Sequence, residues 1–289
     1  MERTDRAAVV TGVSTGIGWS TAKVLCARGL RVFGSVRRQA DAERLSADFG
    51  PGFSPLIFDI TDEPAIHRAA AQVDAALANS TLFGLVNNAG IAVPGPLLHQ
   101  PIADFRRQLE VNLVAQLAVT QAFAPLLGAD RTRRGRPGRI INISSVSGKI
   151  GAPFVGAYTA SKHALEGMSD SLRRELMLYG IDVIVVAPGA IATPIWDKAG
   201  ELDLAPYAQT DYGPIVPKVR DFMIAQGRRG FPPERVGKLI WHALTTPHPR
   251  ARYAIIPRKF QNWTLPRILP ARVIDAAVAK QMGLRRLRD

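Results

Sequence analysis

Short apolar segments alternate with amphipathic helical patterns along almost the whole chain. The segments predicted as strands are rich in β-branched residues and cover 7–11, 31–36, 55–59, 83–87, 138–144, 181–187 and 252–256. The helical patterns between them cover 17–28, 40–48, 62–78, 102–127, 154–179, 214–227 and 234–245. Segment 181–187 is almost continuously apolar, as is usual when helices cover both faces of a sheet. The alternation predicts a doubly wound, parallel α/β sheet in a single domain.

Two regions depart from this alternation. Residues 190–213 are rich in Gly, Pro, Asp and Tyr and show no clear period, which predicts a substrate lid over about 190–230. Beyond the last strand, a basic extension covers 259–289. We therefore expect one catalytic domain over 1–258, lid included, followed by an extension that is helical from Pro270.

Composition excludes several classes of protein. Hydrophobic residues make up 47% of the 289-residue chain, enough for a sizeable core, which argues against global disorder. Cys26 is the single cysteine, which rules out an internal disulfide, and the five histidines show no metal-ligand spacing. The first residues are polar and no apolar run is long enough to span a membrane, so a cytoplasmic location is expected.

The net charge of +13 is concentrated at one end of the chain. Residues 1–130 hold 11 basic and 12 acidic side chains, whereas residues 228–289 hold 14 basic and 3 acidic ones. Such a basic region suggests an anionic partner. Nucleic acid is the weakest candidate, because the region has no recognition motif and no interleaved aromatic residues.

A glycine-rich turn follows the first predicted strand and opens the first predicted helix. The turn has the sequence Thr11-Gly-Val-Ser-Thr-Gly-Ile-Gly18. It predicts that a nucleotide phosphate binds against Gly12, Ser14, Thr15, Gly16, Ile17 and Gly18. Glycines let the backbone approach a pyrophosphate closely, and the start of a helix offers unpaired N–H groups. The turn therefore predicts a Rossmann-like nucleotide site.

Three motifs together resemble the short-chain dehydrogenase/reductase family, particularly its NADP-preferring hydroxysteroid and retinol dehydrogenase branches. They are the TGxxxGIG turn, Asn87-Asn88-Ala89-Gly90 after the fourth strand, and Tyr158-Thr-Ala-Ser-Lys162. They occur in the family's order and spacing over roughly residues 6–257. The resemblance implies an oxidoreductase that interconverts an alcohol and a ketone or aldehyde.

The end of the second strand decides the cofactor. An acidic residue there would bind the ribose hydroxyls of NAD(H) and repel a 2′-phosphate, but the chain has Val36 followed by Arg37 and Arg38. A guanidinium group offers a planar set of donors that matches phosphate. We therefore expect NADP(H) to be preferred over NAD(H), with Arg37 as the first candidate for the phosphate ligand and Arg38 as the second.

The resemblance implies further cofactor contacts. Asp59, followed by Ile60, matches the position whose carboxylate faces the adenine amino group. Residues from Asn87 through Ala89 to Gly90 would pass the adenosine ribose. The turn Pro188-Gly189-Ala-Ile191-Ala-Thr193 would meet the nicotinamide, through the backbone of Ile191 and the hydroxyl of Thr193.

The proton-transfer residues are expected on one helix and one strand end. Tyr158 and Lys162 are four residues apart, so they share a helix face, and the ammonium favours the ionised phenol by lowering its pKa. Ser145 ends the strand before them and would hold the substrate oxygen; Ser144 is the competing choice, and the family's spacing favours Ser145. Asn112 matches the family's fourth residue, which is thought to hold a water linked to Lys162.

The substrate is predicted to be sizeable and apolar, such as a steroid, retinoid or lipid. The lid carries Trp196 and Tyr207, and Phe154 lies near the entrance. The alternative is that these side chains only pack the lid. A different class of function stays open as well, a non-catalytic NADP-binding sensor, although such a protein has no need for the proton-transfer residues.

The basic extension has two interpretations. Its predicted helix carries a stripe of Val273, Ile274, Ala277, Val278 and Met282, accompanied by Arg272, Lys280, Arg285, Arg286 and Arg288. The stripe could contact an anionic membrane from one side, or pack on the domain or on a second subunit. The resemblance also implies a homodimer or homotetramer formed through helices 102–127 and 154–179.

Overall fold

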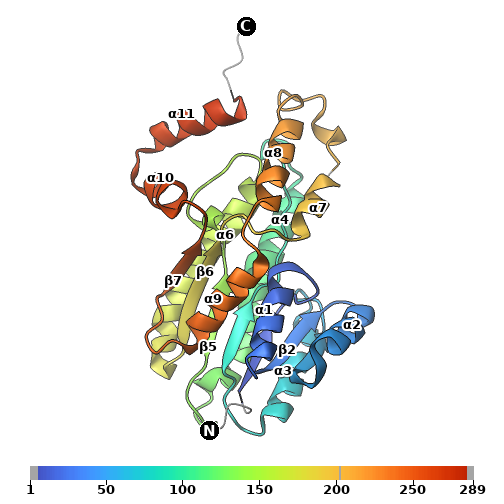
Figure 1. Ribbon diagram of the computed structural model, residues 1–289, viewed down its shortest axis with the longest axis vertical. Coiled ribbons are helices and arrows are strands. Elements are labelled where there is room, and N and C mark those ends of the chain that lie inside the picture. Colours follow the sequence, from blue (N-terminus) through green and yellow to red (C-terminus); the bar gives the residue numbers. More distant parts are fainter. Residues whose placement is uncertain (1–5, 202, 285–289) are drawn as a thin grey trace.

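Seven parallel strands form one sheet at the centre of the molecule (Figure 1). The computed structural model describes residues 6–201 and 203–284. In spatial order the strands are β3 (Phe53–Ile57), β2 (Arg31–Val36), β1 (Ala7–Val10), β4 (Gly84–Asn87), β5 (Arg139–Ile143), β6 (Asp182–Pro188) and β7 (Arg252–Ile255). The prediction of a doubly wound parallel sheet is confirmed.

Alternate residues of each central strand enter two separate cores. Val9, Leu85 and Ile140 are buried on one face, whereas Val10 and Val86 are buried on the other. This follows from the two-residue period of a strand, which sends successive side chains to opposite faces. Because both faces are covered, both sets are apolar, and the strands lack an alternation of polar and apolar residues.

Helices cover each face of the sheet. On one face lie α1 (Gly16–Ala27), α2 (Gln39–Phe49) and α9 (Pro233–Thr245), and their apolar side chains share a core with β1 and β2. The other face is covered by α3 (Glu63–Leu77), α5 (Ala115–Phe123) and α6 (Gly156–Glu175). Connections of this kind bring the carboxyl ends of all seven strands to one edge of the sheet.

Two predicted elements differ from the structure. β3 begins and ends two residues earlier than predicted, and Pro55 therefore lies in the middle of the strand, which an edge strand tolerates. The segment 102–127, predicted as one helix, consists of α4 (Ile102–Leu109), a π-helical turn over Glu110–Val114 and then α5. A second wide turn covers Pro125–Ala129, where Gly128 has a φ of 115°. The first wide turn contains Asn112.

The lid and the extension lie together at one end of the molecule (Figure 1). The lid contains α7 (Ile195–Gly200), a 3-10 turn over Ala205–Tyr207 and α8 (Val216–Arg228). The extension forms a π-helical turn over Phe260–Thr264, then α10 (Leu265–Ile268) and α11 (Ala271–Met282), so the helix expected after Pro270 is present. Leu202 and the expected cations Arg285, Arg286 and Arg288 lie outside the described residues. Within the described ranges, no helix is both long and apolar enough to cross a membrane.

Candidate active site

The strand order reverses between β1 and β4, and the loops that follow these two strands therefore diverge. In open α/β sheets such a reversal leaves a crevice at the carboxyl ends of the strands, where ligands bind. The glycine turn follows β1, and the Asn87–Gly90 motif begins at the end of β4. The predicted motifs are thus brought to one edge of the sheet.

The conformation of the glycine turn explains why it needs glycine. Gly12 has a φ of 69° and Gly16 a φ of 62°, values that other residues rarely adopt. A Cβ atom at Gly18 would clash with the carbonyl oxygen of Gly12, because α1 starts directly against the preceding backbone. Thr15 is the N-cap of α1, and its side chain makes no capping bond. The turn therefore presents backbone N–H groups at the start of a helix, as a pyrophosphate requires.

Hydrogen bonds join the glycine turn to the loop after β4. The Thr11 hydroxyl accepts from the backbone N–H groups of Asn88 (2.9 Å) and Ala89 (3.0 Å). Asn88 Nδ2 donates in return to Thr11 O at 2.8 Å and Gly12 O at 3.1 Å. Gly12 N donates to the Ser35 hydroxyl at 2.9 Å, which adds β2 to the same network. The two sides of the crevice are therefore fixed relative to each other.

Asn112 is buried in the π-helical turn, and its side chain binds the protein backbone. Its Oδ1 accepts from Ile91 N at 2.9 Å, and its Nδ2 donates to Ile91 O at 3.0 Å and to the Ser161 hydroxyl at 3.1 Å. The side chain thus joins the loop after β4 to α6, which carries Tyr158 and Lys162. Wide turns of this kind are frequent at functional sites.

Sequence analysis missed the neighbours of Asn112. Gln108 and Gln116 lie four residues on either side of it, and both are buried. Gln108 binds Ile91 O at 2.7 Å and Val93 N at 2.8 Å, and Gln116 donates to Ala89 O at 3.1 Å. The spacing Gln-xxx-Asn-xxx-Gln is the signal that could have revealed this amide ladder (Gln108, Asn112 and Gln116). It holds the loop over residues 89–93 against the helices.

Ser145, Tyr158 and Lys162 come together at the end of β5 and the start of α6. The Ser145 hydroxyl lies near enough to the Tyr158 phenol to lower its pKa, and it accepts from Ser147 N at 3.1 Å. Lys162 Nζ lies 5.8 Å from the centre of the Tyr158 ring and donates to Ile143 O at 2.8 Å. The Ser144 hydroxyl is buried and lacks a hydrogen-bond partner among the described residues. Of the two candidate serines, Ser145 is therefore the one beside Tyr158.

The electrostatics of this group differ from the expectation. Burial raises the pKa of the Tyr158 phenol, and the hydrogen bond with Ser145 acts in the opposite direction. Burial also lowers the pKa of Lys162 to about 8, against the raising effect of Glu166. Desolvation of the phenol therefore outweighs the effect of Ser145, and the net shift of the Tyr158 pKa is opposite in direction to the lowering expected from the sequence.

The arginines after β2 are exposed. Arg37 Nη1 lies 3.9 Å from Asp59 Oδ2, and the side chain is 72% exposed. Arg38 is held to the start of α2 by Asp41, with 2.8 Å between Nε and Oδ2. Asp59 also accepts from the N–H and the hydroxyl of Thr61. Arg37 is thus the freer of the two guanidinium groups, since its ion pair is long.

Arg44 is a third cation at this end of the crevice, and sequence analysis did not find it. Its Nη2 donates to the carbonyl oxygen of Ser14 in the glycine turn at 2.9 Å and to Asp41 Oδ1 at 3.2 Å. The chain gives little sign of this, because Arg44 lies on α2, 30 residues from the turn. Only the packing of α2 beside the turn brings them together.

Two predicted cofactor residues have buried side chains. Asn87 is fully buried, and its Nδ2 donates to the side chains of Thr120 and Asn142, both at 2.9 Å. Ile60 packs in the core beside α3. Because the core holds both side chains, only the backbone groups of Asn87 and Ile60 are available to a cofactor, and their cofactor contacts stay a prediction.

The turn after β6 is attached to the far end of the lid. Ile191 pairs with Phe231, and Ala192 N donates to Phe231 O at 3.0 Å. Ile191 O accepts from the indole N–H of Trp196 at 2.7 Å. The side chain of Thr193 lies against Gly16, where a Cβ atom would be 3.4 Å away. The glycine turn and the Pro188–Thr193 turn are therefore in contact. The second turn is also joined to β7, because Gly189 N donates to Ile255 O at 2.9 Å.

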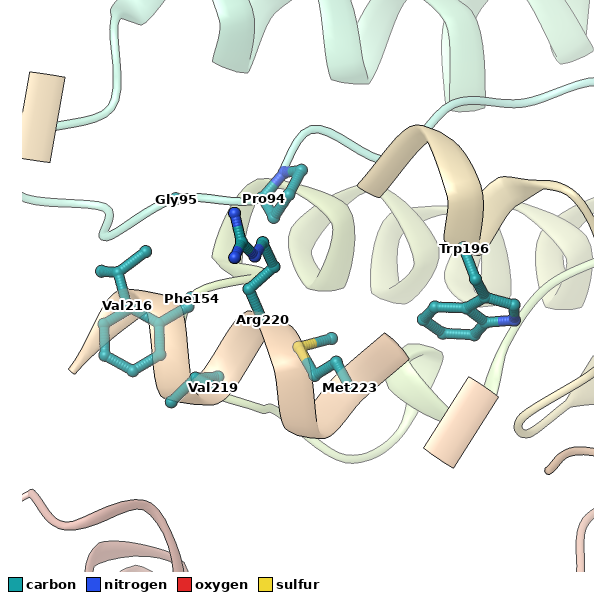
Figure 2. Close-up of a pocket in the computed structure, with 8 residues that line it drawn as sticks. All are labelled: Pro94, Gly95, Phe154, Trp196, Val216, Val219, Arg220 and Met223. Carbon is teal, nitrogen blue, oxygen red and sulfur yellow. The ribbon is translucent and has the colours of Figure 1, made fainter. Parts of the chain in front are cut away.

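A small apolar cavity lies under α8 (Figure 2). Its volume is about 50 Å³, and its lining consists of Pro94, Gly95, Phe154, Trp196, Val216, Val219, Arg220 and Met223. Phe154 and Trp196 thus line it, as the apolar-pocket prediction requires. Tyr207 does not, because its ring is buried in the lid against Gly95 and its neighbours. This burial favours the packing alternative for Tyr207, whose role in substrate binding stays a prediction.

The extension contacts the lid. Met282 and Leu284 pack against the cluster formed by Phe154, Tyr207 and Val216. By contrast, Val273 is 51% exposed. The stripe is therefore divided, since its end packs on the protein's own domain and its beginning faces outward.

Among residues 6–201 and 203–284, no group of His, Cys, Asp and Glu side chains has an arrangement that could hold a metal ion. The glycine turn and the loop after β4 are joined by hydrogen bonds at the carboxyl edge of the sheet, and Ser145, Tyr158 and Lys162 lie at the end of β5 and the start of α6. The family model for short-chain dehydrogenases matches residues 6–203. The chain belongs to the short-chain dehydrogenase family.

Known proteins are similar in sequence to this chain over nearly its whole length. This short-chain dehydrogenase is 40% identical over 277 residues to the NADPH-dependent 3-dehydrocapnine reductase of Ornithobacterium rhinotracheale, covering 96% of this chain and 97% of that one. It is 35% identical to human retinol dehydrogenase 5, covering 93% and 86%. A short-chain dehydrogenase structure from Streptomyces avermitilis superimposes with a TM-score of 0.76 at 25% identity, with both chains fully covered.

The amide ladder predicts that Asn112→Ala destabilises this short-chain dehydrogenase. The substitution leaves the half-buried Ile91 N without its partner, at a cost of about 1–3 kcal/mol, whereas Ile91 O keeps its bond from Gln108 Nε2. We expect the free energy of unfolding to fall by about 1–3 kcal/mol in urea titrations. The matched control is Asn262→Ala, which removes an exposed bond to Pro257 O. An equal, small change in both variants would contradict the structural role of Asn112.

Proposed function

We propose that the protein is an NADP(H)-dependent oxidoreductase that interconverts a sizeable apolar alcohol and its ketone or aldehyde, with Tyr158 as general acid and base. The observation that carries the proposal is the group of Ser145, Tyr158 and Lys162 beside the glycine-turn crevice. Family membership supports the oxidoreductase class. The names of two relatives, an NADPH-dependent reductase and a retinol dehydrogenase, support the cofactor and the apolar substrate.

The crevice fits a dinucleotide. Its glycines leave no room for side chains where the backbone must approach a pyrophosphate, and Gly18 is the clearest case. We assign the phosphates to the turn from Gly12 to Gly18. The adenosine would lie along Asp59, Ile60 and the backbone from Asn87 through Ala89 to Gly90. The nicotinamide end would lie along the backbone and hydroxyl groups of Pro188, Gly189, Ile191 and Thr193.

The proton steps use residues of the chain. When bound, the cofactor supplies or accepts a hydride at the carbon of the substrate carbonyl. The Ser145 hydroxyl holds the carbonyl oxygen beside the Tyr158 phenol, which donates its proton to that oxygen during reduction. Lys162 then provides the positive charge that stabilises the phenolate left behind.

The pKa directions suit the reductive reaction. A phenol whose pKa is raised by burial stays protonated at neutral pH, and a general acid must carry its proton. Lys162, with its pKa lowered to about 8, releases a proton more readily than an ordinary lysine and can therefore pass one to the phenolate. Asn112 positions both groups, since it binds Ser161 of the same helix.

The substrate would occupy the apolar cavity under α8. Phe154, Trp196 and Met223 form its walls, and Trp196 is bonded to Ile191 at the nicotinamide end. The cavity of about 50 Å³ is far smaller than the several hundred Å³ that a drug-sized ligand occupies. The lid must therefore open to admit a large substrate, with α8 as the element that moves.

A homodimer or homotetramer is part of the proposal. The helices expected at the interface, α4 with α5 and α6, carry exposed apolar residues that a second subunit could cover. Ile102 is 63% and Val114 is 45% exposed. Leu98, just before α4, is 77% exposed.

The first test is Tyr158→Phe. We expect NADPH oxidation with long-chain and cyclic apolar ketones to fall at least about a thousandfold, because general acid catalysis is lost, with NADPH affinity changed less than about threefold. Tyr179→Phe is the control, since that tyrosine lies in the 3-10 turn at the far end of α6. Substantial turnover by Tyr158→Phe would refute the mechanism. Tight NADPH binding by the unmutated protein without turnover of any carbonyl would indicate a sensor.

The second test concerns the cofactor phosphate. Arg37→Ala should weaken NADPH binding by about tenfold or more and leave NADH binding unchanged, because a charge-assisted bond to phosphate is lost. Arg44→Ala tests whether Arg44 is a second phosphate ligand. If it is, the variant should weaken NADPH binding alone; if Arg44 only braces the glycine turn, the binding of NADPH and of NADH should weaken equally. Arg31→Ala, at the opposite end of β2, is the control. The affinities are measured from the fluorescence of the bound reduced cofactor. Equal affinity of the unmutated protein for NADH and NADPH would refute the assignment of Arg37 to the phosphate.

The third test concerns the extension, for which we propose contact with an anionic membrane surface. Its outward apolar residues Phe260 and Ile268 are 65% and 68% exposed and lie among the cations Lys259, Arg267 and Arg272. The protein should sediment with phosphatidylcholine vesicles only when they contain phosphatidylglycerol. Changing Phe260 and Ile268 to Ser should abolish this, whereas Leu178→Ser, equally exposed elsewhere, should not. Absence of the unmutated protein from both pellets would refute the contact.

A further inference from the structure

Among the described residues that line the apolar cavity, Arg220 is the only charged one, and the others are apolar or glycine. It lies on α8, one turn before Met223 and next to Val219. Figure 2 shows its guanidinium group extending toward Pro94 and Gly95, on the opposite wall of the cavity. A packing role alone would be served by an uncharged side chain, so the charge needs an explanation.

The ion pair of Arg220 is weak. Its Nε and Nη2 bind Asp221 Oδ1 at 3.0 and 2.9 Å, and Asp221 is the adjacent residue. The Asp221 side chain is 66% exposed, whereas that of Arg220 is 27% exposed. An exposed pair of this kind contributes little stability, because water screens it. Asp221 is the only acidic partner recorded for Arg220 within residues 6–201 and 203–284.

The guanidinium therefore keeps donors for another group. An arginine carries five N–H donors in a planar array, and a pair through one carboxylate oxygen uses only part of it. The free side of the array suits an oxyanion, which it can bind with two parallel hydrogen bonds. Partial removal from water strengthens such a bond relative to one on the surface.

The place of Arg220 limits the substrate. Phe154 precedes the catalytic Tyr158 by four residues, and Trp196 is bonded to the turn assigned to the nicotinamide. A molecule in the cavity thus meets apolar walls and one cation, next to the indole that is bonded to the turn assigned to the nicotinamide. The combination fits an amphiphile rather than a neutral hydrocarbon.

We propose that Arg220 is a specificity-determining residue that binds an oxyanion group of the substrate, so the preferred substrate is an anionic, long-chain ketone. This inference rests on the proposed reductase activity. It adds that the anionic group interacts with α8, whereas the hydrocarbon chain contacts Phe154, Val219 and Met223. Binding of the anion would draw α8 toward the cavity and close the lid over the substrate.

The test compares matched charged and neutral ketones. The probes are 3-oxotetradecanoate with its methyl ester, and 2-oxotetradecyl phosphate with its neutral alcohol, each assayed by NADPH oxidation. Arg220→Met keeps the apolar stem and should raise KM for the charged probes by about tenfold to a hundredfold, with the neutral probes changed less than about threefold. Arg220→Lys should recover part of the loss. The two charged probes distinguish a carboxylate from a phosphate.

Lys218→Met is the control, because it removes the same charge from an exposed position on α8 outside the cavity lining. It should leave all four probes within about twofold. Equal losses on charged and neutral probes in Arg220→Met, or a preference of the unmutated enzyme for the neutral probes, would overturn the inference and leave the reductase proposal intact.

Binding gives a second readout that does not depend on turnover. Calorimetry with NADPH-loaded protein should show that dodecanoate binds more tightly than dodecanol, and that Arg220→Met removes the difference. If no ketone is reduced but this difference holds, the reductase proposal fails and the anion site stands. Equal binding of the two probes by the unmutated protein would exclude the site.

Discussion

β1 pairs with β2 along one side and with β4 along the other, in registers that match Val9 with Phe33 and with Leu85. The strand order reverses between β1 and β4, so the loops that follow these two strands diverge, and in open α/β sheets such a reversal leaves a crevice at the carboxyl edge. The hydroxyl of Thr11 accepts hydrogen bonds from the backbone N–H groups of Asn88 and Ala89 in the loop after β4. Every part of the site is positioned relative to this junction, because the helices that carry the chemistry are anchored to one loop or the other.

The amide ladder connects the junction to the chemistry. Asn112 binds Ile91 on one side and Ser161 on the other, and Ser161 lies one residue before Lys162. Lys162 is buried and Tyr158 is half-buried, and desolvation shifts both pKa values toward the neutral forms. Such shifts cost stability and are therefore typical of functional sites. A buried, well-braced helix lets the protein keep these groups in a fixed geometry.

Much of the fold follows from local patterns. The apolar strand segments and the glycine turn were identifiable because strand burial and a left-handed φ require particular residue types at particular places. Other features depend on distant partners and were missed. Arg44 approaches Ser14 only through the packing of α2, and Asn87 enters the core because Thr120 and Asn142 supply its hydrogen bonds. Segment 102–127 is periodic enough to look continuous, although an inserted turn at Asn112 divides it.

The sequence by itself determined the strand and helix order, the position of the glycine turn and the spacing of Tyr158 and Lys162, since these depend on neighbours a few residues apart. Tertiary structure decided which serine meets Tyr158, that Tyr207 packs inside the lid, and that Arg220 reaches the cavity wall beside Pro94. These outcomes depend on which segments, distant from one another in the sequence, pack together in the folded chain. Periodicity can place a side chain on a helix face, but desolvation and hydrogen-bond partners come from chain segments far away in the sequence.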